Sequence, residues 1–186
     1  MEQPTLQTTR LILRPYVHGD AEGIVRISNN MNVVRWTAAH PFPYELKDAH
    51  EFLAKCEREW VERKAAFFAC VLCDTGELIG GGGFKLELAQ ERGEIGYAIG
   101  EPHWGRGYAT ESAVRLLRYG FEDLGLSRIN ASVHGTNVGS IRVLEKLGMV
   151  KEGVQRRHTL RFGVKDDLVL FGVLREEWAS RAARLE

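Results

Sequence analysis

No apolar run of about 18 residues occurs in the 186-residue sequence, so no membrane-spanning helix is predicted. The opening stretch, MEQPTLQTTR, lacks the apolar core of a secretory signal. The formal net charge is zero, so no overall field attracts nucleic acid or an anionic membrane. These absences favour a cytoplasmic globular protein that has no membrane partner and no direct nucleic-acid partner.

Cysteine is also scarce, with three residues, an odd number that favours reduced thiols in the absence of a signal. Cys70 and Cys73 form a C-x-x-C, which could be a redox pair or half of a zinc site. They lie in the apolar run AFFACVLC without a second ligand pair at metal spacing, and residues three apart in a strand face opposite sides. We therefore expect core thiols and no metal.

Two common nucleotide-binding motifs are missing. The four glycines 80–83 are not followed by the Gly-Lys-Ser/Thr of a phosphate loop. After Gly105 and Gly107, the third glycine of a dinucleotide fingerprint would fall at Thr110. A generic nucleotide-binding protein is therefore disfavoured.

The stretch 94–124 instead predicts a strand, a glycine-containing turn and a helix that ends before Gly125. Gly105 and Gly107 allow the backbone to approach a bulky group closely. The free N–H groups at the start of a helix favour an anion such as phosphate, and Arg106 adds a positive charge. A strand–helix turn without a ligand is the alternative.

The remaining pattern predicts one mixed α/β domain over residues 1–186, with one sheet and helices on both faces. The glycines 80–83 lie in a strand, where either a bulge or a closely approaching group is expected. Asp20 is a candidate N-cap for the first helix. Strands are expected at 9–15, 66–74, 78–86, 94–99, 128–134, 149–154 and 167–174, with a polar, basic loop or irregular hairpin at 155–164. Helices are expected at 21–28, 46–63, 110–124, 138–147 and 175–186.

Several short motifs occur together in one order. They are Gly96-Tyr97, the run Trp104 to Ala109, Thr110-Glu111, Asn137, Ser140, and the run Leu144 to Gly148. With them the chain resembles the GNAT superfamily of N-acetyltransferases, and within it the RimJ/RimL-like group, which includes ribosomal-protein N-terminal acetyltransferases. The resemblance covers nearly the whole chain. It implies a mostly antiparallel central sheet whose central strands splay apart at a β-bulge.

The resemblance also implies acetyl-CoA as the acetyl donor. The glycine turn would bind the pyrophosphate through backbone amides, and pantetheine would pair with the splayed strand. Trp104 departs from the superfamily's usual Gln or Arg, although Trp is usual in the RimJ/RimL-like group. The residues expected at the donor are Tyr97, Ala98, Ile99, Trp104, Gly105, Arg106, Gly107, Tyr108, Ala109, Thr110, Asn137 and Ser140.

Acetyl transfer from a thioester needs a neutral amine and a proton for the leaving thiolate. An α-amine, with a pKa near 7.7–8.0, is roughly a tenth neutral at pH 7, whereas a lysine amine is almost fully charged. Glu94 is the expected base, with a water chain or a merely solvated carboxylate as alternatives. The position of the superfamily's usual tyrosine acid is Leu144, which cannot donate a proton. Ser140 is therefore the expected acid, with a plain helix-surface serine as the alternative.

The acceptor pocket is expected in the loop that contains Arg35, Trp36, Phe42 and Tyr44. His158 and Tyr16 are weaker candidates, and simple packing of the aromatic residues is the alternative. A protein N-terminus is the expected acceptor. A polyamine, an aminoglycoside or an amino acid would be a small-molecule alternative, and an acetyl-CoA-sensing module a non-catalytic one. Analogy with the family also allows a homodimer, formed through residues 175–186.

Overall fold

The computed structural model describes residues 2–37 and 40–182, so parts of the expected acceptor loop and of the C-terminal tail lie outside the described residues. One open sheet has the strand order β1-β2-β3-β4-β5-β6-β8-β7. Its strands are Leu6–Gln7 (β1), Leu11–Pro15 (β2), Ala65–Leu72 (β3), Leu78–Glu87 (β4), Arg92–Ile99 (β5), Arg128–His134 (β6), Val150–Arg161 (β7) and Val164–Leu174 (β8). All neighbouring strands are antiparallel except β5 and β6, which are parallel. The predicted fold class is confirmed.

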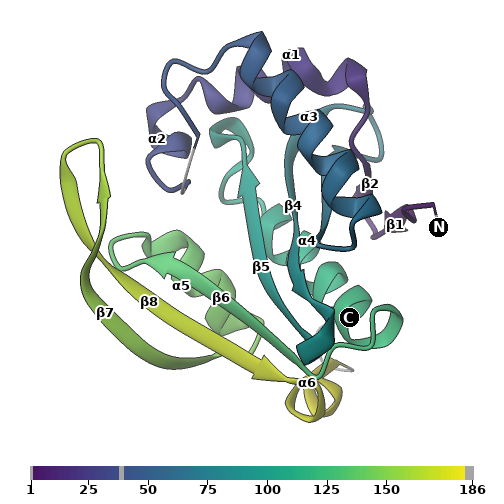
Figure 1. Cartoon of the computed structure of the whole chain (residues 1–186), viewed down its shortest axis with the longest axis vertical. Coiled ribbons are helices and arrows are strands. Elements are labelled where there is room, and N and C mark those ends of the chain that lie inside the picture. Colours follow the sequence, from purple (N-terminus) through teal and green to yellow (C-terminus); the bar gives the residue numbers. More distant parts are fainter. Residues whose placement is uncertain (1, 38–39, 183–186) are drawn as a thin grey trace.

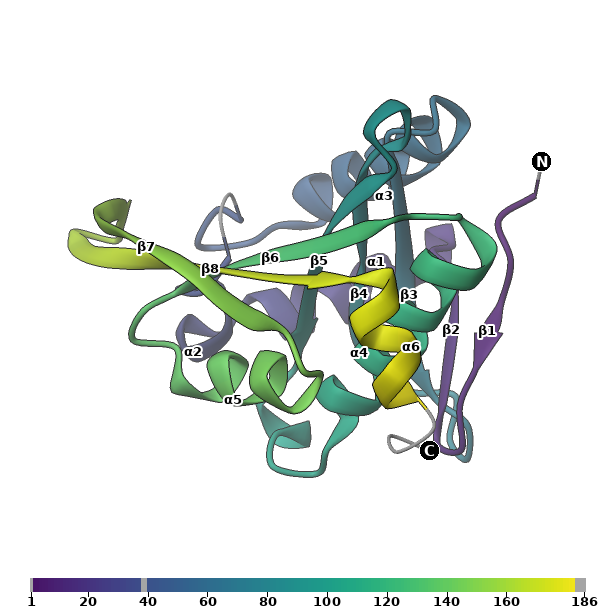
Figure 2. The ribbon, with the colours of Figure 1, turned by 90° about the horizontal axis from the view of Figure 1, so that it is seen from below.

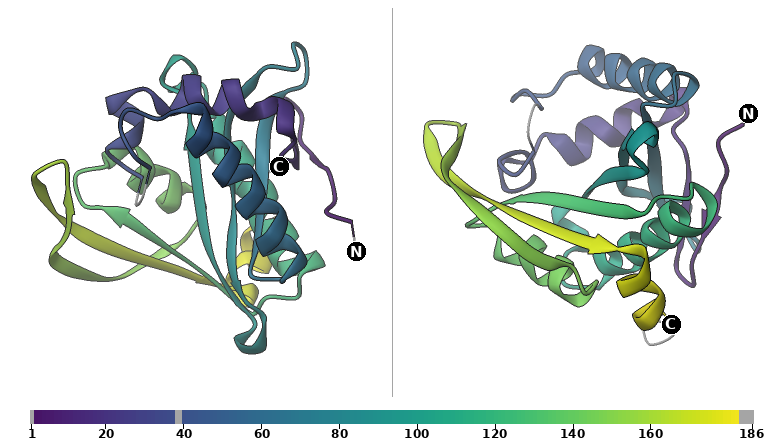
Figure 3. Two further views of the ribbon diagram at one scale, coloured as in Figure 1. Left: turned by 45° about the horizontal axis from the view of Figure 1, so that its top comes forward. Right: turned by 60° about the horizontal axis from the view of Figure 1, so that its bottom comes forward.

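Helices cover both faces of this sheet. They are Ala21–Ser28 (α1), Met31–Val34 (α2), Leu46–Val61 (α3), Tyr108–Arg118 (α4), Val138–Lys146 (α5) and Arg175–Ala182 (α6). Helices α1 and α3 pack on one face, and α4 and α5 lie on the other (Figure 3). None of the helices in the described part of the chain is long and apolar enough to cross a membrane.

The core has one cluster on each face of the sheet. Leu116 and Leu117 of α4 are fully buried in the larger cluster, and Ile24 of α1 and Ala49 of α3 belong to the smaller one. Strand β3 is covered on both faces, which explains its unbroken apolar sequence. Among the cysteines, Cys70 is buried as predicted, and Cys56 of α3 is buried as well. Cys73 was also expected in the core, and this expectation is wrong: the residue is exposed, because it follows the last residue of β3.

Strands β5 and β6 meet at one end and then separate. Only three residue pairs join them, ending at Glu94 and Asn130. Beyond that point β5 stays paired with β4, while β6 continues along β8, so the two strands diverge in a V (Figure 1). The β4–β5 register is unbroken over its whole length, so the expected bulge is not seen in that ladder. The splay itself is present as predicted.

The glycine run in β4 follows a bulge and also lies in a crowded place. The register between β3 and β4 shifts between Cys70 and Val71, next to Ile79, which directly precedes the run. A Cβ atom on Gly81 would lie 1.8 Å from the hydroxyl of Tyr16. The sheet therefore needs glycine here for packing, without any bound ligand.

Some sequence-based expectations were incomplete or wrong. Of the two alternatives for the basic stretch 155–164, the irregular hairpin is confirmed: the stretch forms the outer part of a long hairpin of β7 and β8, with a register shift between Gln155 and Thr159, and the hairpin extends beyond the rest of the sheet (Figures 1 and 2). Its exposure on both sides removes the apolar alternation that marks a strand. Strand β1 and helix α2 were not predicted, because β1 has only two residues and α2 only four. Asp20 makes no side-chain cap; its carboxylate instead pairs with Arg14 at 2.7 Å.

Candidate functional site

The V between β5 and β6 opens into a cleft of about 1190 Å³. Its walls come from β5 and β6, the start of α4, the start of α5, the end of α2 and the end of β7. Helices α4 and α5 lie on one side of β6, and α3 lies on the other (Figure 2). The cleft therefore passes between the two faces of the sheet and offers a separate side to each of two substrates.

One edge of this cleft is an unpaired strand backbone. The amide of Gly100 donates to Ile79 of β4 at 2.8 Å. Because hydrogen-bonding direction alternates along an antiparallel strand, Tyr97 and Ile99 direct their backbone groups towards the gap. The indole Nε1 of Trp104 donates to the Ile99 carbonyl at 2.6 Å. The backbone groups of Tyr97 and the Ile99 amide are then left facing the cleft, where an amide-bearing chain could pair with them.

The glycine turn has the geometry of an anion site. Gly105 and Gly107 have φ of 73° and 84°, which side-chain-bearing residues adopt at a cost. Gly107 is the N-cap of α4, so the helix begins at Tyr108, two residues earlier than predicted. The first bond within the helix runs from Glu111 N–H to Gly107 C=O at 3.0 Å. The amides of the three residues before Glu111 have no partner within the helix and can bind a phosphate.

Arg10 holds this turn in place. Its Nη1 donates to the Arg106 carbonyl at 3.0 Å, its Nε donates to Glu111 at 2.7 Å, and its guanidinium lies over the ring of Tyr108. The side chain of Arg106 does not line the cleft, so its expected role rests on its backbone alone. No local pattern could have revealed the role of Arg10, because its partners lie about 100 residues away in the sequence.

Across the gap, β5 and α5 are joined by two hydroxyls. The side chain of Tyr97 lies 3.0 Å from Ser140 Oγ, and either hydroxyl can donate. Asn137 caps α5 and accepts from the Ser140 amide at 3.1 Å, so the capping fixes where Ser140 lies. Burial raises the pKa of Tyr97 to about 12, against the opposing effect of the Ser140 hydrogen bond. The phenol therefore stays protonated at neutral pH.

Leu144, the position that lacks the usual tyrosine, is fully buried in the core. It cannot take part in proton transfer. Sequence reasoning identified Ser140, but it assigned only a backbone role to Tyr97. The alternation of strand β5, with even-numbered residues on one face, could have indicated that the side chain of Tyr97 points towards α5.

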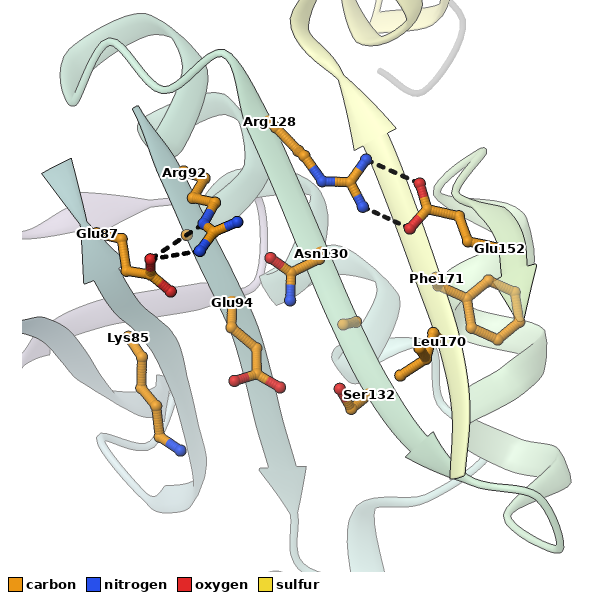
Figure 4. Close-up of a pocket in the computed structure, with 12 residues that line it drawn as sticks. Lys85, Glu87, Arg92, Glu94, Arg128, Asn130, Ser132, Glu152, Leu170 and Phe171 are labelled. Carbon is orange, nitrogen blue, oxygen red and sulfur yellow. Dashed lines mark hydrogen bonds and ion pairs between the residues drawn. The ribbon is translucent and has the colours of Figure 1, made fainter. Parts of the chain in front are cut away.

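Glu94 lies on the opposite face from Tyr97, three residues away along β5. It is paired across the sheet with Lys85 of β4 and with Asn130 of β6, so these three side chains share one face (Figure 4). The cleft lining includes both Glu94 and Lys85. Glu94 is therefore placed at the point where β5 and β6 separate, with access to the cleft.

A smaller pocket of about 350 Å³ continues along this face (Figure 4). It shares Lys85, Glu94 and Ser132 with the large cleft. Its far end contains two ion pairs, Arg92 with Glu87 and Arg128 with Glu152, whose charges cancel. The acceptor side of the site is thus a groove with a neutral far end.

The expected acceptor residues are only partly brought together. Arg35 and Trp36 line the cleft, and so does His158 on β7. Tyr44 is buried in the smaller core cluster, where its hydroxyl donates to the Asp48 carbonyl, so its expected pocket role is wrong. Phe42 does not line the cleft either; its ring contacts Phe162 of the hairpin.

Tyr16 is partly buried against the smaller core cluster, and the burial raises its pKa well above the usual value for a phenol. Its position beneath α1 and α3 excludes it from the cleft. The loop after α2 nevertheless reaches the far wall, because Trp36 packs edge-on against His134 of β6 and Arg161 of β7 donates to the His40 carbonyl. Sequence reasoning missed His134 and Arg161.

The cleft carries an uneven charge. Among the described residues that line it, Glu94 is the single carboxylate. The lysine and arginine side chains of the lining are Arg35, Lys85, Arg142, Lys146 and Arg161. Arg142 and Lys146 belong to α5, on the face of the glycine turn, and can serve a second anionic group there. No set of three or more His, Cys, Asp or Glu side chains within the described ranges could hold a metal ion.

Comparisons with known proteins agree on one family. The model of the acetyltransferase (GNAT) domain matches residues 10–150. Uncharacterized N-acetyltransferase p20 of Bacillus licheniformis is 34% identical over 177 residues, which cover 94% of this chain and 98% of that protein. FsC-acetyl coenzyme A-N(2)-transacetylase of Aspergillus fumigatus is 29% identical over 95% of this chain and 78% of its own length. The solved structure of Mycobacterium smegmatis RimJ in complex with CoA-disulfide superposes with a TM-score of 0.85 at 23% identity, covering 98% of this chain and 91% of that one.

Proposed function

Because the chain belongs to the GNAT family of acetyltransferases, we propose that it transfers the acetyl group of acetyl-CoA to the α-amine of a protein N-terminus, as a RimJ/RimL-like enzyme. The observation that carries this proposal is the placement of Glu94 and of the Tyr97–Ser140 pair on opposite faces of the strand that borders the gap. A thioester in the gap would have a base on one side and a proton donor on the other.

The donor would bind along the α4 and α5 side of the cleft. Its pyrophosphate would accept hydrogen bonds from the free amides at the start of α4, where the helix dipole also favours negative charge. Its pantetheine amides would pair with the backbone of Tyr97 and with the Ile99 amide. Arg142 and Lys146 would contact the remaining phosphate.

Glu94 on one face of β5 and the Tyr97–Ser140 pair on the other face would each serve one proton transfer of the reaction. The neutral amine attacks the thioester carbonyl, so a C–N bond forms, and the carboxylate of Glu94 takes the proton that the amine loses, directly or through water. When the intermediate collapses, the C–S bond breaks and the thiolate of CoA takes the proton of Ser140 Oγ. The protonated phenol of Tyr97 passes its proton to Ser140 in the same step, and the resulting phenolate regains a proton from solvent while Glu94 releases the proton that it took from the amine.

The charge of the cleft lining and the pKa of the acceptor amine indicate which class of acceptor the site suits. An α-amine is roughly a tenth neutral at pH 7, so a single carboxylate is an adequate base, whereas a lysine amine needs more help. A polyamine or an aminoglycoside carries several positive charges and would need an acidic site. The lining contains one carboxylate and several cations within the described residues, which disfavours both.

Two relatives bear on the alternatives. The structural neighbour RimJ favours a protein N-terminus, whereas the Aspergillus fumigatus transacetylase, from its name, favours a smaller amine. A non-catalytic acetyl-CoA sensor would not need Glu94 and Ser140 in the same cleft. Cytoplasmic location, a single domain and a homodimer stay predictions.

Calorimetry with acetyl-CoA, ATP and NAD tests the donor. We expect saturable binding of acetyl-CoA alone. A thiol-release assay with N-terminal peptides, amino acids, spermidine and an aminoglycoside then tests the acceptor, and α-amines should give the highest kcat/KM. Preference for spermidine, or the absence of acetyl-CoA binding, would contradict the proposal.

A further inference from the structure

Within the part of the chain that the structure describes, three cations of the acceptor side have no carboxylate partner. Lys85 lies beside Glu94 on the neighbouring strand, Arg35 follows α2, and Arg161 ends β7. Among the described residues, no Asp or Glu lies within 4.0 Å of the charged atoms of these three side chains. By contrast, the basic residues of the adjoining pocket, Arg92 and Arg128, are both paired. Within the described residues, the adjoining pocket therefore has its arginines neutralised, whereas the acceptor side of the cleft has positive charge that no carboxylate compensates.

The two arginines line the cleft from different segments, Arg35 from the loop after α2 and Arg161 from the end of β7. Arg35 stands over the ring of Trp36, with 4.4 Å between the guanidinium carbon and the ring centroid. Arg161 stands in the same way over Phe162, at 4.3 Å. An aromatic face under a guanidinium holds its plane and leaves its edge free to bind an anion. Both arginines line the cleft, and Trp36 packs on His134 across the mouth.

Arg161 also has an unused donor. One of its terminal nitrogens donates to the His40 carbonyl, which fixes the side chain against the loop after α2. Its Nε is buried and has no hydrogen-bond partner among the described residues. A buried N–H group without a partner is costly, and in native proteins it usually has one. A carboxylate bound in the cleft would accept a hydrogen bond from this Nε–H group.

These observations concern the acceptor, and the inference rests on the proposed acetyl transfer. We propose that the acceptor is an amine that carries a carboxylate close to the reacting nitrogen, and that Arg35 and Arg161 bind this carboxylate while the amine lies at Glu94. A guanidinium suits this role because it offers planar, paired donors to a carboxylate. Lys85, next to Glu94, adds positive charge on the same side.

Two sources could supply this carboxylate. A free amino acid has its own, and a protein N-terminus has one if an acidic residue follows the first residue. Both fit the same recognition chemistry. The acceptor series therefore includes serine with serinamide, and C-terminally amidated peptides that differ only by Asp or Asn at the second position.

The test measures kcat/KM by thiol release from acetyl-CoA with these matched pairs. We expect the carboxylate-bearing member of at least one pair to be about tenfold better, and the pair that shows the preference identifies the source. In Arg35→Gln and Arg161→Gln the preference should fall to within about twofold, because the carboxylate-bearing member loses more of its kcat/KM than the neutral member does. Arg156→Gln, which changes an exposed arginine of β7 outside the cleft, is the matched control and should keep the full preference.

The possible results separate the two proposals. Equal rates for acid and amide in both pairs would overturn the inference and leave acetyl transfer to an α-amine intact. A carboxylate preference that survives both arginine substitutions would overturn the assignment to Arg35 and Arg161. Binding of acetyl-CoA in calorimetry without thiol release for any amine would overturn the proposed function and, with it, this inference. Circular dichroism of the variants verifies that they are folded.

Discussion

The hydroxyl oxygens of Tyr97 and Ser140 lie 3.0 Å apart and join β5 to the first turn of α5 across the open end of the V. Strand alternation directs Tyr97 towards α5, and the Asn137 cap fixes the Ser140 backbone. Neither hydroxyl reaches Glu94, which points from the other face of β5. A base and a proton donor are thereby kept apart, on the two sides of the bond that would be broken.

Replacing Ser140 should slow the chemical step moderately. For Ser140→Ala we expect kcat to fall about tenfold, which is less than the roughly hundredfold or more that is typical for general acids, because a thiolate with a thiol pKa near 8.5 leaves well without full protonation. Tyr97→Phe should lower kcat by a smaller factor. The double variant should be no slower than Ser140→Ala, since Tyr97 acts through Ser140. Thiol release at saturating substrates measures this. An unchanged kcat in Ser140→Ala would remove Ser140 from the mechanism.

Glu94→Gln should have an effect that depends on pH. At pH 7 most of the α-amine is protonated, so loss of the base should lower kcat/KM by about a hundredfold. Above the α-amine pKa of about 8 the amine is largely neutral on its own, and the deficit should shrink. Glu57→Gln on the exposed side of α3 is the matched control. A wild-type rate at pH 7 would exclude Glu94 as the base and favour a water chain.

Gly107→Ala should weaken acetyl-CoA binding. A φ of 84° costs an alanine roughly 1 kcal/mol or more, and the added Cβ would lie 3.4 Å from Nη2 of Arg10. We expect about a tenfold higher Kd in calorimetry. Gly107→Asn should recover part of the loss, because asparagine tolerates this backbone region. Gly153→Ala, at an uncrowded position without positive φ, should bind acetyl-CoA as the wild type does.

The Arg10–Glu111 pair should contribute stability that depends on pH. Burial opposes ionisation of Glu111, but hydrogen bonds from Thr8 and Arg10 outweigh it and hold its pKa below the usual 4.5. A lowered pKa gives stability that is present above 4.5 and is lost as the pH falls through the folded-state pKa. Glu111→Gln should therefore lower the free energy of unfolding by about 1 kcal/mol at pH 7 and by less in acid. A difference that is equal at pH 7 and at pH 3 would contradict this.

The sequence predicted most of the fold because its signals are local. The alternation and β-branched residues of β6, and the turn residues that flank α1 and α5, predicted bounds close to those observed. The long hairpin was underestimated, since exposure on both sides leaves no apolar alternation to read. The start of α4 was set two residues late, because Gly107 acts as the N-cap without a side chain that would mark it.

The sequence predicted those site residues that belong to motifs in a recognisable order. It did not predict those whose position depends on how the folded chain packs. Glu94, Ser140 and the glycine turn line one cleft, as the resemblance implied. Tyr44 was misplaced because an aromatic residue in a loop has the same pattern whether it lines a pocket or packs the core. Arg10 and Arg161 were missed because their partners are distant in sequence.

Acetyl transfer to an α-amine is tested most directly by one pair of peptides. They share a sequence with an internal lysine, and one has a free N-terminus while the other is blocked by acetylation. With acetyl-CoA, the account predicts thiol release with the free peptide, a product with one added acetyl group on its α-amine, and almost no release with the blocked peptide. Equal release with both peptides would place the acetyl group on lysine, and no release with either, despite acetyl-CoA binding, would contradict an enzyme that acts on protein N-termini.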